Sequence, residues 1–174
     1  MLIFEEPPRA DPPHVNSERA GLEAWLEFHR QTLIAKCSGL TAEQLALRSV
    51  PPSTLSLLGL VRHLAEVERY WFREVLAGES EATAGSLYCS ESDPDGDFDG
   101  AAAAGAATDR ETFLAELDVV RGVAAGHGLD DTGRRGNGQP VDLRWIYTHL
   151  IAEYARHNGH ADLLRQCIDG VTGE

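Results

Sequence analysis

Apolar side chains recur every three or four residues in four long stretches of this chain, which is the spacing that buries one face of an α-helix. The stretches cover residues 17–38, about 53–77, 108–125 and 143–168. Ser17 and Asp142 stand at helix starts, and Thr108 opens the third stretch in a capping-box pattern. Gly78 and Gly170 follow helix ends, where glycine is favoured. The pattern therefore predicts four amphipathic helices.

The segments between these helices carry turn-forming residues. Residues 1–16 hold four prolines and predict a loose N-terminal arm, whereas Thr41-Ala42-Glu43-Gln44 predicts a short capped helix. Residues 79–107 and 126–140 are rich in Gly, Ala, Ser and Asp and predict loops, with no convincing strand. We therefore expect an all-α fold. It would be a four-helix bundle in a single domain, residues 17–174, with a long loop between its second and third helices.

Composition and charge exclude several classes of protein. The chain has 174 residues, 43% of them apolar, which suits one domain with a core. No apolar run reaches the roughly 18–20 residues of a membrane span, and the acidic start lacks the basic region of a signal peptide. The net charge of −13 disfavours nucleic acid as a partner. The three cysteines are far apart and odd in number, so we expect a cytoplasmic protein without a disulfide framework.

Two of these cysteines, Cys37 and Cys167, have apolar neighbours at helical spacing and are predicted to be small core residues.

Residues 95–100 read DGDFDG and match the first six positions of a calcium loop. Ala106 stands where that loop needs a bidentate Glu, so calcium binding is disfavoured.

The last predicted helix carries candidate chemistry on its buried side. At about 100° per residue, His157 falls in the middle of the apolar stripe and Glu153 on its edge. His149 and His160 lie further round the same side. A buried carboxylate needs compensation, which an ion pair or a bound metal can supply. Both interpretations stay open for Glu153 and His157 taken alone.

His63 borders the apolar stripe of the second long helix and is the candidate third ligand. A lone histidine at this position is most often a rim residue. Together, His63, Glu153 and His157 make a set of two histidines and one carboxylate, which leaves a fourth position open for substrate. Such a set suits Zn²⁺ best in our interpretation, and Ni²⁺ or Fe²⁺ as well.

Two strings give the chain a family resemblance. Residues 142–165 read DLRWIYTHLIAEYARHNGHADLLR, and residues 55–72 read LSLLGLVRHLAEVERYWF. Both resemble helix signatures of the DinB-like superfamily, in particular the branch that contains mycothiol-dependent transferases and isomerases. The resemblance implies a four-helix bundle with a divalent metal inside it, held by His63, Glu153 and His157. It also implies an acidic loop near the metal pocket, which here would be the loop that contains residues 95–100. Many relatives carry Gln in place of His160, so the resemblance implies that His160 supports the ligands and does not itself bind the metal. We expect His149 to have a similar supporting role.

The resemblance and the open ligand set favour a metal-dependent enzyme. We expect an S-transferase that activates a low-molecular-weight thiol, mycothiol or a similar compound, for attack on an electrophilic small molecule. Two alternatives stay open: a metal-dependent hydrolase that uses bound water, and a metal-binding protein without catalysis. The sequence leaves the identity of the thiol and the electrophile open. It also leaves open the oligomeric state, for which a homodimer is one option.

Overall fold

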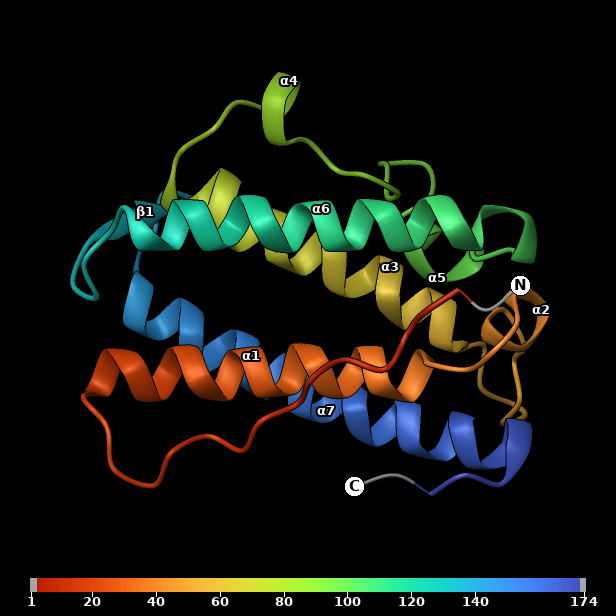
Figure 1. Cartoon of the computed structure of the whole chain (residues 1–174). Coiled ribbons are helices and arrows are strands. Elements are labelled where there is room, and N and C mark those ends of the chain that lie inside the picture. The colour runs from red at the N-terminus through yellow and green to blue at the C-terminus, as the bar shows by residue number, and fades with distance from the viewer. Residues whose placement is uncertain (1–2, 173–174) are drawn as a thin grey trace.

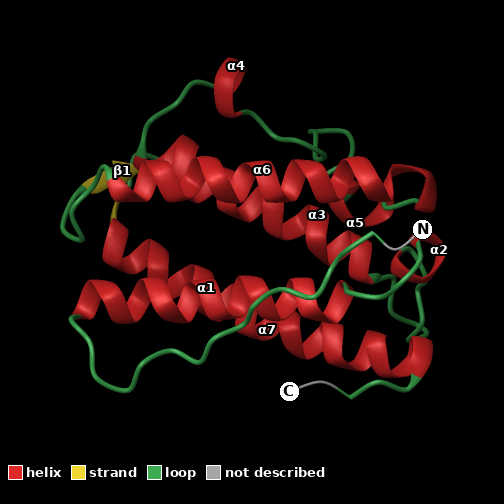
Figure 2. Ribbon diagram, in the orientation of Figure 1, coloured by secondary structure: helices red, strands yellow, loops and turns green. Residues whose placement is uncertain are grey.

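The prediction of a helical chain is confirmed. The structure is a computed structural model that describes residues 3–172, and most of this part of the chain is helical (Figures 1 and 2). The long segments are α1 (Glu18–Cys37), α3 (Leu57–Glu68) with its continuation η1 (Arg69–Leu76), α6 (Ala106–Ala125) and α7 (Leu143–Asp169). The short elements are α2 (Ala42–Leu45), α4 (Glu81–Ala84), α5 (Gly96–Asp99), η2 (Ala103–Gly105), β1 (Thr132–Arg134) and β2 (Pro140–Asp142).

The four long segments pack side by side around one apolar core. Helix α1 runs along α7, and α3 lies against both α6 and α7 (Figure 1). All four contribute fully buried side chains, among them Leu26, Leu64, Phe113 and Leu150. None of the described helices is long and apolar enough to cross a lipid bilayer.

Polar caps fix where the helices that carry the candidate site begin. Ser56 accepts a hydrogen bond from the Gly59 N–H at 3.1 Å and starts α3. Asp142 accepts one from the Trp145 N–H at 2.7 Å and starts α7, as the sequence predicts. Helix α7 ends at Gly170, whose φ of +81° is the left-handed conformation that glycine adopts without strain.

The continuation of α3 departs from regular α-helix. Segment η1 is π-helical, and its wide turns are closed by bonds such as that from the Ala77 N–H to the Phe72 carbonyl oxygen at 3.0 Å. The transition follows Glu68, whose carboxylate makes a buried bidentate ion pair with Arg30, at 2.7 Å for both contacts. Single π-helical turns inside α-helices often occur near functional sites.

Three local predictions are wrong. Residues 132–134 and 140–142 pair as an antiparallel hairpin where a loop was expected, and Thr132 pairs with Asp142. Thr108 does not cap the third long helix, because α6 already begins at Ala106 after the turn of η2. Cys167 is exposed, since at about 100° per residue it lies well off the buried stripe of α7.

The predicted N-terminal arm is only partly loose. Its segment crosses α1 in Figure 1, where Arg9 Nη1 donates to the Thr32 hydroxyl at 3.5 Å. Phe4 is buried in the core, and its carbonyl oxygen accepts a hydrogen bond from the Gly39 N–H at 3.3 Å. Cys37 is buried, as predicted.

Candidate metal centre

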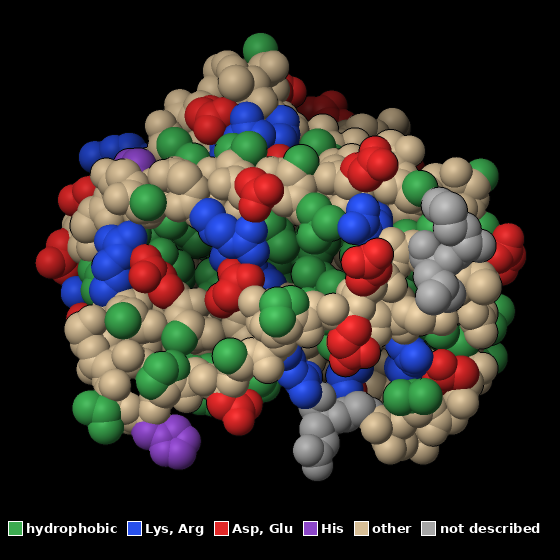
Figure 3. Space-filling model, viewed as in Figure 1, with side chains coloured by type: hydrophobic (Ala, Val, Ile, Leu, Met, Phe, Trp, Pro, Cys, Tyr) green, Lys and Arg blue, Asp and Glu red, His purple; other side chains and the backbone are tan. Residues whose placement is uncertain are grey.

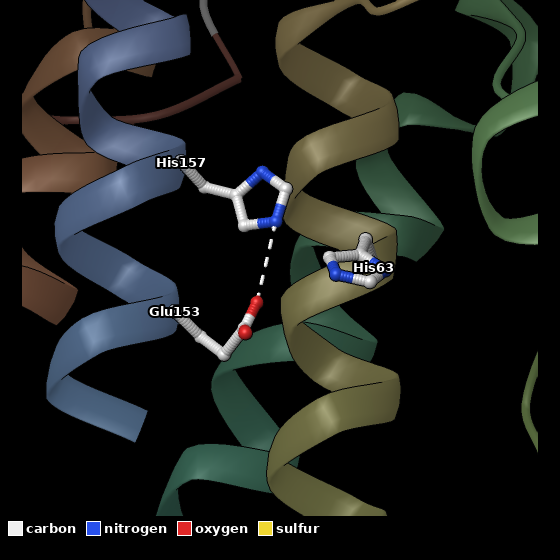
Figure 4. A group of neighbouring side chains, drawn as sticks. All are labelled: His63, Glu153 and His157. Atoms are coloured by element: carbon white, nitrogen blue, oxygen red, sulfur yellow. Dashed lines mark ion pairs between the residues drawn. The ribbon is translucent and has the colours of Figure 1, made fainter. Parts of the chain in front are cut away.

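Two helices present the three candidate ligands to one another. Glu153 and His157 are one turn apart on α7, so both side chains leave the same face of the helix. His63 faces them from α3 (Figure 4). One ligand atom from each residue lies within 4.8 Å of the other two. The structure thus brings together the three residues that the sequence singles out.

The three side chains are largely shielded from solvent. The side chains of His157, Glu153 and His63 are 10%, 15% and 22% exposed, so each keeps a narrow path to solvent. Burial, together with the nearby His63 and His160, lowers the pKa of His157 from 6.5 to about 4. His157 is therefore neutral at pH 7, which is the form in which an imidazole binds a metal.

The contact between Glu153 and His157 is not a close ion pair. Glu153 Oε2 lies 3.6 Å from His157 Nε2, the contact that Figure 4 marks with a dashed line. This distance is too long for a good hydrogen bond, and a neutral imidazole carries no charge for the carboxylate. The exposed Arg156 approaches Glu153 at 3.4 Å. A surface arginine compensates little, so this geometry favours the metal interpretation over a simple Glu–His pair.

An acidic residue from the long loop holds His63. Asp97 Oδ2 lies 2.8 Å from His63 Nδ1, which leaves Nε2 as the free nitrogen of the ring. Burial raises the pKa of Asp97, but the hydrogen bond and charge of His63 outweigh it and leave the pKa lowered. Asp97 is thus ionised and acts as acceptor. The resemblance implies an acidic loop near the pocket, and Asp97 lies in it, within α5.

The other two histidines lie near the centre but in different settings. His160 Nδ1 is 3.3 Å from His157 Nδ1, on the side of the His157 ring away from Glu153. His149 stacks on Trp145 with ring centroids 4.8 Å apart and meets the edge of Trp71 at the same distance. Burial lowers the pKa of His149, although the charge of Glu153 acts in the opposite direction.

The donor set matches what a divalent cation needs. Two imidazole nitrogens and one carboxylate oxygen, all from rigid helices, form a ligand set with an open position that zinc and other first-row metals accept. The Asp97–His63 contact is the kind of outer hydrogen bond that accompanies metal-bound histidines. The residues present therefore fit a divalent metal.

Comparison with known families decides the affiliation of the chain. A model of the mycothiol-S-transferase family matches residues 21–170. The chain belongs to the mycothiol S-transferase family. This family is part of the DinB-like superfamily, so the resemblance stated from the two helix strings is confirmed. A search of curated proteins found no match.

Membership of the mycothiol S-transferase family implies a thiol substrate, and one of the candidate ligands lines a cavity. The cavity has a volume of about 270 Å³, and its wall includes His63 and Asp97 together with Tyr70, Trp71 and Cys89. Of the three candidate ligands, His63 is the one in this wall. Its aromatic and polar lining is typical of small-molecule sites.

A larger cavity of about 380 Å³ lies away from this centre. Its wall includes Phe72. Figure 3 shows hydrophobic side chains, in green, in the hollow between α1 and α6, with acidic and basic side chains around it. The arginines in its wall are engaged: Arg30 pairs with Glu68, and Arg121 pairs with Glu27 at 2.9 Å. Its lining includes none of the three candidate metal ligands. Of these two cavities, only the smaller one is lined by a candidate ligand, His63.

Asp97 is the residue at this centre whose role the sequence does not reveal. The calcium-like string draws attention to residues 95–100 but does not say which carboxylate faces inward. Asp97 is buried, whereas Asp95 and Asp99 are more exposed. Only packing of the loop against α3 distinguishes them, and no local pattern encodes that contact.

Proposed function

We propose that this protein is a divalent-metal-dependent S-transferase that joins a low-molecular-weight thiol, mycothiol or a similar compound, to an electrophile. The family match over residues 21–170 supports a thiol transfer reaction. The observation that carries the metal dependence is the cluster of His63, Glu153 and His157, of which His63 also lines a cavity. Zn²⁺ is the ion we favour, and Ni²⁺ and Fe²⁺ suit the same donors.

In this proposal, His63, His157 and Glu153 would hold the ion through two imidazole nitrogens and a carboxylate oxygen. When bound, a divalent metal supplies a Lewis acid that lowers the pKa of a coordinating thiol. The low pKa of His157, about 4, keeps a competing proton off that imidazole at neutral pH. Glu153 would bring the one negative charge among the three ligands, so they would leave part of the charge of a divalent ion uncompensated, which favours a thiolate over a thiol.

The chain also offers a base for the thiol proton. His149 lies one turn before Glu153 on α7, and its lowered pKa leaves it uncharged and able to accept a proton at neutral pH. We assign the thiol proton to the imidazole of His149. The sulfur then uses its electron pair to form the bond to the electrophilic carbon, and the leaving group departs with the pair of the broken bond. His160 holds the His157 ring from behind through the contact between their Nδ1 atoms.

Conjugation of a thiol tests the proposal. The protein is stripped with EDTA, reloaded with Zn²⁺ or Ni²⁺, and incubated with mycothiol and a bimane electrophile, whose thioether is fluorescent. We expect conjugation above the uncatalysed rate with the loaded protein only, and a loss of that rate in the His157→Ala variant. No metal-dependent turnover with mycothiol, bacillithiol or cysteine would contradict the proposal. Metal-dependent cleavage of an ester panel instead would identify a hydrolase.

Further proposals concern the organisation of the chain. We interpret the four long helices as a four-helix bundle in one domain spanning residues 17–174, which acts in the cytoplasm. Light scattering on the purified protein decides between a monomer and a homodimer. Limited proteolysis tests the domain: a resistant core that begins near residue 17 supports it, and early cleavage within a long helix contradicts it.

A further inference from the structure

The loop before α6 reaches the candidate metal centre through one carboxylate. Asp97 Oδ2 lies 2.8 Å from His63 Nδ1, and Asp97 is not itself among the three residues whose ligand atoms cluster. We propose that Asp97 is a positioning residue, which accepts the Nδ1 proton of His63 and thereby keeps the lone pair of Nε2 available to the metal. The inference rests on the proposed metal site, and its test includes a measurement that needs no metal.

Both oxygens of Asp97 have assigned partners. Oδ2 faces His63, while Oδ1 accepts a hydrogen bond from the Phe98 N–H at 2.8 Å. The Phe98 ring stacks on the His63 imidazole with centroids 4.7 Å apart and an angle of 25° between the planes. The imidazole is therefore fixed by a hydrogen bond at one edge and by an aromatic ring on one face.

The backbone that carries Asp97 is itself anchored to the helices. Arg62, the neighbour of His63, donates from Nε to the Asp97 carbonyl oxygen and from Nη2 to the Gly96 carbonyl oxygen, both at 2.8 Å. Its Nη1 also contacts Asp109 of α6 at 3.1 Å. One arginine thus joins α3, α5 and α6. Arg62 therefore holds the loop, while His63, the next residue of α3, faces the candidate metal centre.

The close fit of the loop extends to Gly96. A Cβ atom at this position would lie 2.4 Å from the Tyr88 carbonyl oxygen, so no larger residue fits without movement of the loop. The Tyr88 ring lies under the guanidinium of Arg62, whose central carbon is 3.9 Å from the ring centroid. The segment from Tyr88 to Asp97 is therefore packed on Arg62 and has few ways to place the carboxylate elsewhere.

A carboxylate at Nδ1 has a definite consequence for the opposite nitrogen. A neutral imidazole carries one proton, and an acceptor-only carboxylate draws it to Nδ1, so Nε2 has a free lone pair. The negative charge also raises the basicity of Nε2. Loss of such an outer partner typically weakens metal binding by roughly 10–100-fold.

The substitution Asp97→Asn inverts this arrangement with almost no change in shape. If the Asn carbonyl oxygen keeps the bond from the Phe98 N–H, the amide NH₂ faces His63 Nδ1 as a donor. His63 then accepts at Nδ1 and carries its proton on Nε2, the nitrogen that the metal needs. We expect roughly 10–100-fold weaker Zn²⁺ binding, measured by competition with a chromophoric chelator.

The matched control is Asp99→Asn, since Asp99 lies on the same short helix with a 59% exposed side chain paired to Arg48. We expect its Zn²⁺ affinity to equal that of the wild type. Equal affinity of Asp97→Asn and the wild type would overturn the proposal, whereas absence of Zn²⁺ binding by the wild type would contradict the proposed function instead.

The tautomer of His63 is the second readout and uses metal-free protein. Long-range ¹H–¹⁵N correlation spectra distinguish a ring protonated at Nδ1 from one protonated at Nε2. We expect Nδ1–H in the wild type and in Asp99→Asn, and Nε2–H in Asp97→Asn. A wild-type His63 that carries its proton on Nε2 would overturn the proposal, whether or not the Asp97→Asn variant folds.

Discussion

Glu153 and His157 lie one turn apart on α7, with Glu153 Oε2 3.6 Å from His157 Nε2, yet neither group satisfies the other. The distance is too long for a good hydrogen bond, and His157 is neutral at pH 7 because burial lowers its pKa to about 4. A shielded carboxylate beside a neutral imidazole is costly unless a cation compensates it. With His63 opposite, a divalent ion bound by the three residues would supply that compensation.

Removal of one ligand should abolish most of the metal binding. We expect His157→Ala to weaken Zn²⁺ binding by more than the roughly 10–100-fold typical of a residue behind a ligand, because only two protein donors remain. The control is His127→Ala, since His127 Nδ1 contacts the Val123 carbonyl oxygen at the end of α6, away from the cluster. Competition with a chelator measures both variants. Stoichiometric, tight Zn²⁺ binding by His157→Ala would show that the ligand set is wrong.

The stability of the metal-free protein should fall in mild acid. Below about pH 6.5 the unfolded chain takes up a proton on His157, whereas the folded protein does not until about pH 4. The unfolded state therefore binds more protons in this window, so the free energy of unfolding decreases as the pH falls from 6.5 to 4. Urea titrations in EDTA measure the effect, and His157→Gln should flatten the curve. An equal decrease in both proteins would assign it to other groups.

The long helices follow from the sequence because their signals are local. Ser17 and Asp142 do cap α1 and α7, and Gly170 does end α7 in the left-handed conformation. Thr108 misleads, because the same letters that mark a capping box also occur inside a helix. Inside α6, Asp109 pairs with Arg62 at 3.1 Å and takes no part in a helix cap. Local patterns thus locate the helices better than their exact ends.

Local sequence patterns predict neither the hairpin of β1 and β2 nor the contact of Asp97 with His63, because both depend on packing between distant segments. Each strand has only three residues, and Gly133 and Pro140 are poor strand formers. The pairing therefore depends on packing of the hairpin against η1, which the sequence does not show. His63 and Asp97 are 34 residues apart, and their contact exists only once the loop folds onto α3. Helical periodicity reveals His157 and Glu153 because both lie on one helix.

The hairpin contact with η1 leaves no room at Gly133. A Cβ atom there would lie 1.9 Å from the Val75 carbonyl oxygen, whereas one at Gly136 would meet nothing within 4 Å. We expect Gly133→Ala to cost about 1–3 kcal/mol of stability through overpacking, and Gly136→Ala to cost little. Urea unfolding of both variants checks this. Equal stability of the two would mean that the hairpin does not pack on η1 as described.

Replacement of only one partner of the buried ion pair between Arg30 and Glu68 should lower the stability of the protein strongly. Glu68 is fully buried and Arg30 is 5% exposed, with both contacts at 2.7 Å. We expect Glu68→Gln to cost roughly 3–5 kcal/mol, because it leaves a guanidinium buried without its anion. Replacement of both partners, Arg30→Met with Glu68→Leu, should cost less than the single change. A double variant that is less stable than Glu68→Gln would contradict this account.

Elemental analysis of the protein purified without chelators is the most direct test of the metal centre. Our account predicts close to one divalent ion per chain in the wild type, with Zn²⁺ the leading candidate, and a large loss of that metal in both His63→Ala and His157→Ala. His127→Ala should retain the wild-type content. A wild type with only traces of metal that neither ligand substitution lowers would contradict the account, and would leave Glu153 and His157 as a buried pair without an ion.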